Sequence, residues 1–239
     1  YRRQRQMCIR DRSMGAHCTG GRPAVNKRAL MMGAIFLTSF GGIVSLLGAT
    51  TISTELGAQV GAPAFFTGVL IAAKYAPSVI AMPYATSFAA KWGTKPLFLT
   101  GQVSMIVLNL VLALLIAVGA PTYATLLVFT VIMGFVGAML HALVPVVMKS
   151  YLPSKSIAGS LSKAAVANGL AAVLGALFGT VMLAHVVPEL TFVVNAVLTI
   201  PYVLVLWLMK PATPVGSPTH VQHASVSYTH LTLPTILLV

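Results

Sequence analysis

Residues 29–51 read ALMMGAIFLTSFGGIVSLLGATT, a run of 23 residues without a charged side chain. An α-helix rises about 1.5 Å per residue, so a helix of this length crosses the hydrocarbon core of a bilayer, which is about 30 Å thick. The sequence therefore predicts a transmembrane helix at this position.

Five further apolar runs of similar length follow. The chain of 239 residues is 57% hydrophobic and 8% charged, whereas about a quarter of the residues in a water-soluble domain are charged. This composition argues against a water-soluble enzyme, and no run shows the alternation of a β-strand. We expect an all-α membrane protein with a bundle over residues 29–210, whose six helices cover residues 29–51, 64–89, 96–118, 123–147, 157–184 and 190–209.

Both ends of the chain resemble DNA-library sequence. Residues 2–11 read RRQRQMCIRD, which is similar to the translated adapter of transposase-tagged sequencing libraries, and residues 226–235 read VSYTHLTLPT, which fits its translated reverse complement. We expect residues 1–12 and 226–239 to be adapter-derived and exclude them from fold reasoning. Without the five arginines and one aspartate of the first segment, the net charge falls from +12 to +8. We therefore expect no nucleic-acid partner.

The remaining charges are distributed unevenly between the two sides of the predicted bundle. The loops on one side contain Glu55 and Glu189 and no basic residue. By the positive-inside rule, the basic side is cytoplasmic. We call residues 13–225, between the two adapter-like ends, the insert. We expect both ends of the insert on the cytoplasmic side of the cell membrane, with residues 13–28 as an arm. The nine basic residues of that side are Arg22, Lys27, Arg28, Lys91, Lys95, Lys149, Lys155, Lys163 and Lys210.

The turn between the second and third predicted helices carries a recognisable motif. Residues 86–96 read TSFAAKWGTKP, which resembles the G-x-L-A-D-R-x-G-R-K loop of the major facilitator superfamily, although Thr86, Ala90 and Thr94 depart from it. A tight turn with positive φ explains the glycine, and lysines hold such a turn at the membrane surface. The resemblance implies a gating turn formed by Lys91, Gly93 and Lys95.

Three later helices carry further resemblances to the same superfamily. Gly134 occupies the glycine of its R-x-x-x-G pattern, with Thr130 in place of the arginine. Residues 168–179, NGLAAVLGALFG, are similar to its glycine-rich fifth helix, and residues 192–198, FVVNAVL, resemble permeases related to bacterial siderophore and drug exporters. Small residues spaced four apart let another helix approach closely. We expect the helix-packing glycines to be Gly169, Gly175 and Gly179.

The resemblance implies the amino-terminal half of a twelve-helix transporter. Each half of such a transporter is built from inverted three-helix repeats, and the solute binds between the halves near the bilayer midplane. We therefore expect the lipid bilayer, a small-molecule substrate and a carboxy-terminal six-helix half as partners. Residues 211–225 would begin the central cytoplasmic loop, and the natural chain would continue past residue 225. The implied function is alternating-access transport of an organic solute, with efflux as the direction.

Lys74 is the main candidate for substrate binding. It lies about eleven residues into the second predicted helix, where a charged side chain costs at least about 2.5–3.5 kcal/mol near the bilayer centre. It could bind an anionic substrate group or pair with a carboxylate of another helix, and the sequence leaves both open. A lysine that snorkels without a dedicated role is the alternative.

Three more residues are candidates for the translocation pathway. His141 could relay protons or simply pack. Asn109 could bind substrate or bridge helices, and Tyr75 could line a cavity.

No motif for ATP hydrolysis, metal binding or nucleophilic catalysis is present. Cys18 is the one cysteine outside the adapter-like ends. We therefore expect no enzyme activity, no metal and no cofactor. Two other functions stay open, namely half of a sugar or organic-acid symporter and a six-helix scaffold subunit that transports nothing.

Overall fold

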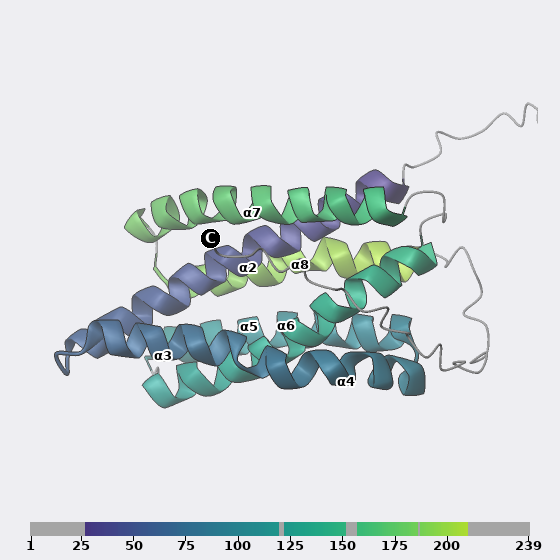
Figure 1. The fold of residues 1–239 in the computed structure, drawn as a ribbon. Helices are drawn as coiled ribbons and strands as arrows, with labels where there is room; N and C mark the ends of the chain where they lie inside the picture. The colour runs from purple at the N-terminus through teal and green to yellow at the C-terminus, as the bar shows by residue number, and fades with distance from the viewer. Residues whose placement is uncertain (1–26, 120–121, 152–156, 186, 210–239) are drawn as a thin grey trace, which may run out of the picture.

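The computed structural model describes residues 27–119, 122–151, 157–185 and 187–209. In this part of the chain every regular element is an α-helix (Figure 1). Six stretches are long and apolar enough to cross a membrane, which confirms the prediction of an all-helical fold with six membrane-spanning helices. The helices are α2 (Lys27–Ala58), α3 (Pro63–Tyr75), α4 (Pro77–Trp92), α5 (Thr94–Ala117), α6 (Tyr123–Tyr151), α7 (Ile157–His185) and α8 (Glu189–Leu208).

The second span differs from the single helix predicted over residues 64–89. It runs from Pro63 to Trp92 but is divided into α3 and α4 at Ala76. Pro77 has no backbone N–H to donate to the carbonyl group four residues earlier, and its ring crowds that carbonyl. The span is therefore interrupted near its middle.

Two helices extend beyond the apolar runs that predicted them. α2 continues past residue 51 to Ala58, and the chain turns at Gly61 with φ of 73°. α6 continues past residue 147 to Tyr151. A helix can continue through polar residues after it leaves the hydrocarbon core of the bilayer. A hydropathy pattern ends with the apolar run, so it places the carboxy-terminal ends of these helices too early.

α2 is the central helix of the bundle. Its most extensive contacts are with α7 and α8, and α7 lies along it on the outside of the bundle (Figure 1). Glycines permit both approaches: a Cβ added at Gly175 of α7 would lie 3.0 Å from the carbonyl oxygen of Phe40, and one added at Gly41 of α2 would lie 2.8 Å from the Asn195 Oδ1 of α8. Close backbone packing therefore holds α2 between its neighbours.

The prediction that Gly169 is a packing glycine is wrong. A Cβ added there would meet no atom within 4 Å, whereas one added at Gly179 would meet Leu47 of α2. Gly169 precedes Gly175 by six residues, which turns it about 120° around the helix axis. It therefore faces away from α2.

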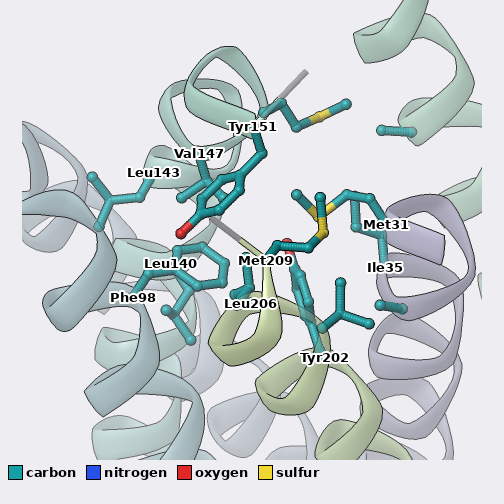
Figure 2. Packing of buried hydrophobic residues seen from close by; sticks show 14 of the residues in the cluster. Met31, Ile35, Phe98, Leu140, Leu143, Val147, Tyr151, Tyr202, Leu206 and Met209 are labelled. Atoms are coloured by element: carbon teal, nitrogen blue, oxygen red, sulfur yellow. The ribbon is translucent and has the colours of Figure 1, made fainter. Parts of the chain in front are cut away.

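Buried apolar side chains form two clusters, one toward each end of the bundle. The larger cluster joins the first turns of α2 and α5 to the last turns of α4, α6 and α8. Figure 2 shows Tyr151 of α6 and Tyr202 of α8 among its members. Lys91 and Lys149 lie in the last turns of α4 and α6, so they share this end of the bundle. The smaller cluster, with Leu70 and Phe192, lies toward the other end.

Large apolar side chains are also exposed along the spans. Val79 of α4 is 78% exposed, and Leu177 of α7 is 62% exposed. Contiguous apolar surface of this kind needs lipid or another apolar surface against it. The outer faces of the bundle are therefore suited to a bilayer.

The contact between α7 and α2 provides the first testable prediction. Gly175→Leu should force the two backbones apart and lower the free energy of unfolding by about 1–3 kcal/mol, as overpacking does elsewhere. Gly169→Leu is the matched control, because the same side chain at that position meets open space. Thermal unfolding of both purified variants in detergent measures the difference, and equal midpoints would contradict this packing.

Candidate functional site

The candidate site lies at the interruption between α3 and α4. Lys74 is the penultimate residue of α3, and the span that contains it covers 30 residues, so the lysine is near the middle of that span. The backbone around it is held by local bonds: the Ala76 N–H donates to the Ala72 carbonyl at 2.7 Å, and the Ser78 hydroxyl donates to the Tyr75 carbonyl at 2.6 Å. These bonds satisfy the Ala72 and Tyr75 carbonyl groups on either side of the interruption.

Gly134 of α6 allows the interrupted helix to approach α6 closely. A Cβ added at Gly134 would clash with the Lys74 carbonyl oxygen and would lie 3.2 Å from the Lys74 Cα. Any larger residue would have to displace backbone atoms of α3, which cannot rotate away as a side chain can. The position of Lys74 in the bundle therefore depends on the absence of a side chain at residue 134.

The Lys74 residue is half-buried as a whole, and its ammonium group has no acceptor in the part of the chain that the structure describes. The two carboxylates of that part, Glu55 and Glu189, lie in the last turns of α2 and at the first residue of α8. Neither forms an ion pair with Lys74 there. A cation without a partner near the middle of a membrane span is costly, and such residues commonly mark substrate pathways.

His141 shares the face of α6 that carries Gly134. The two residues are seven positions apart, which is about two turns of helix. The His141 side chain is exposed. The structure therefore brings Lys74 and His141 to the same part of the bundle, a proximity that no sequence motif indicates.

Tyr75 does not lie on the face of α3 that carries Lys74. Its side chain is 56% exposed, and it is turned about 100° from Lys74 around the helix axis. Lys74 instead follows Leu70, which is fully buried, along one face.

Asn109 lies in a buried network that links three helices. The Asn195 side-chain amide donates to Asn109 Oδ1 at 3.1 Å and to Ser45 Oγ at 3.1 Å, while Asn109 donates to the Met105 carbonyl at 2.7 Å. Asn109 is 1% exposed. These contacts correspond to the helix-bridging use that the sequence left open, and the sequence offered no signal for Ser45.

The turn between α4 and α5 has the backbone predicted for it. Gly93 has φ of 85° and ψ of 142°, a conformation that favours glycine. Lys91 is exposed at the end of α4. Lys95 donates to the Met209 carbonyl at 3.3 Å and to the Trp207 carbonyl at 3.5 Å. Its charge therefore stabilises the unsatisfied carbonyl end of α8, a contact that sequence reasoning missed.

A shallow cavity of about 140 Å³ lies between α5 and α6. Leu97, Thr100, Phe135 and Met139 are among its lining residues, and none of the candidate site residues is. In the described residues no group of histidine, cysteine and acidic side chains could hold a metal ion. The cavity therefore adds no chemistry to the site.

The buried asparagine pair provides the second prediction. In a double-mutant cycle with Asn109→Ala and Asn195→Ala, the coupling energy should be about 0.6 kcal/mol or more, since interhelical hydrogen bonds in membranes average about 0.6 and reach about 1.7 kcal/mol. Thr100→Ala combined with Asn195→Ala is the control and should be additive, because the Thr100 hydroxyl bonds within its own helix. Reversible unfolding in mixed micelles measures both cycles, and a zero coupling for the asparagine pair would refute the bridge.

The comparison with protein families agrees with this architecture. The model of the Major Facilitator Superfamily matches residues 29–237, which include all six candidate spans. No curated protein matches the chain significantly. The matched region covers most of the 239 residues, and the chain therefore belongs to the Major Facilitator Superfamily, a family of multi-pass membrane transporters that are typically not enzymes.

Proposed function

We propose that this chain is the amino-terminal six-helix half of a secondary active transporter that moves a small organic solute out of the cell. Transporters of this architecture bind their solute near the bilayer midplane, between two halves that rock against each other. Six spans supply one such half, and the carboxy-terminal half would form the opposite wall of the pathway.

The observation that carries this proposal is the unpaired cation of Lys74 near the middle of a span. A lysine in contact with hydrocarbon would be strongly disfavoured, whereas one that lines a water-filled pathway keeps its hydration. The interruption at Pro77 adds a point where α3 and α4 can change their relative direction. We assign Lys74 and His141 to the wall of this pathway, whereas Tyr75 lies on another face of α3.

The orientation in the cell membrane follows from charge. Lys91, Lys95 and Lys149 lie at the end of the bundle where the larger apolar cluster is found, and we place this end in the cytoplasm. Both ends of the insert are then cytoplasmic, with residues 211–225 in the central loop. Those residues, residues 13–26 of the predicted arm and the adapter-like ends lie outside the described residues, whereas Lys27 and Arg28 already belong to α2.

The turn at Lys91, Gly93 and Lys95 is our candidate for a gate on the cytoplasmic side. Lys95 links the start of α5 to the end of α8, so movement of this turn would carry both helices with it. The outward direction is supported by the resemblance of residues 192–198 to exporter-like permeases.

Extrusion assays test this function. The natural protein that carries this segment, expressed in a bacterial host without its own efflux pumps, should raise the inhibitory concentration of at least one compound in a panel of amphipathic dyes and antibiotics. Lys74→Ala should lower transport about tenfold or more, as expected when a hydrogen bond to a charged group is lost. Lys163→Ala removes an exposed lysine of α7 and is the matched control.

Membrane insertion of each variant is checked by immunoblotting. Equal extrusion by the Lys74→Ala variant and the unaltered protein would remove Lys74 from the pathway. A protein that extrudes no compound of the panel would count against outward transport.

A further inference from the structure

Within the described spans, the titratable side chains away from the helix ends are basic residues and tyrosines. The described part of the chain has two acidic residues, Glu55 and Glu189, and neither lies in the middle of a span. Lys74 and His141 are the charged or titratable side chains, apart from tyrosines, that do lie inside the described spans away from their ends. This half of the bundle thus offers positive charge and hydrogen-bond donors, and no carboxylate, to whatever occupies the pathway.

The geometry brings these two basic groups together from separate helices. The Lys74 backbone of α3 is pressed against Gly134 of α6, and His141 follows on the same face of α6 about two turns later. The Lys74 ammonium has no acceptor among the described residues, and a charge without a partner in a medium of low dielectric is stabilised by an anion beside it.

We propose that the solute is an organic anion whose acidic group is held by the Lys74 ammonium, with the His141 imidazole as a second donor. This inference rests on the proposed function, and it names the chemical class of the solute. An ammonium group binds a carboxylate or a phosphonate as a point charge with rotatable donors, so the site demands negative charge more strictly than it demands one shape of acidic group.

The backbone arrangement explains why the lysine is available for a ligand. Pro77 interrupts the span one turn after Lys74, and the contact with Gly134 fixes the Lys74 Cα while leaving the side chain half-exposed. Anchoring the backbone and leaving the ammonium unpaired preserves its full charge for an incoming group. If Lys74 instead formed a structural ion pair, its partner carboxylate would have to come from outside this half. Loss of that pair would destabilise the ligand-free protein, whereas loss of a ligand site would weaken anion binding.

Ligand-induced thermal stabilisation of the purified natural protein in detergent tests the proposal. The probes are matched pairs of a carboxylate and its neutral amide: lactate and lactamide, benzoate and benzamide, and decanoate and decanamide. Phenylphosphonate is added to separate carboxylate from phosphonate recognition. We expect at least one anion to raise the unfolding midpoint while its amide does not.

Variants then assign the effect to the site. Lys74→Gln should weaken binding of the stabilising anion about tenfold to a hundredfold, and Lys74→Arg should retain part of the affinity because the charge is kept. Lys74→Glu should lose the anion and gain stabilisation by benzylamine. Lys163→Gln is the matched control and should bind as the unaltered protein does.

Three results would overturn the proposal. One is stabilisation by the amides equal to that by the acids, and another is no stabilisation by any anion of the panel. The third is a lowered midpoint of ligand-free Lys74→Gln without any anion effect, which would assign Lys74 to an internal ion pair. Anion binding without extrusion would contradict outward transport alone, so failure of the function and failure of this inference are distinguishable.

Discussion

The hydrocarbon core of the bilayer cannot solvate charge, and this constraint explains most of the chain. It accounts for the low content of charged residues, for the position of Lys91 and Lys149 at helix ends, and for six stretches that satisfy their backbone groups as helices. Lys74 is the exception, because its ammonium group lies near the middle of a span. An exception to so strong a constraint is the best guide to function in this bundle.

Close packing of helices around α2 forms the rigid bundle that positions Lys74. Lipid tails are as apolar as leucine, so helices in a membrane associate through small residues and polar contacts more than through burial from water. Gly175 and Gly41 place α7 and α8 against α2, while Asn195 ties α8 to α2 and α5 through Ser45 and Asn109. Gly134 plays the same part between α6 and α3, where the contacting atoms belong to Lys74 itself.

The sequence predicts the spans well because hydropathy and helix length are local properties. It also predicts the conformation of Gly93, since a turn between two helices needs positive φ. Prediction from the sequence fails where the same residue type occurs in two different structural environments. Pro83, Pro145 and Pro201 lie inside helices, whereas Pro77 separates two, and Gly169 faces open space while Gly175 contacts α2. Neighbouring helices decide between these outcomes. They also determine the contact of Gly134 with the Lys74 backbone and the contact of Lys95 with α8, neither of which a local pattern predicts.

Accessibility of residue 74 to water-soluble reagents tests the central claim most directly. In the natural protein with its own cysteines replaced, Lys74→Cys should react with a membrane-impermeant thiol reagent added from either side of the membrane, because alternating access exposes the pathway to each side in turn. The account predicts reaction from both sides, slowed by a bound organic anion. Reaction with a lipid-soluble maleimide alone would place residue 74 in hydrocarbon and contradict a pathway lined by Lys74.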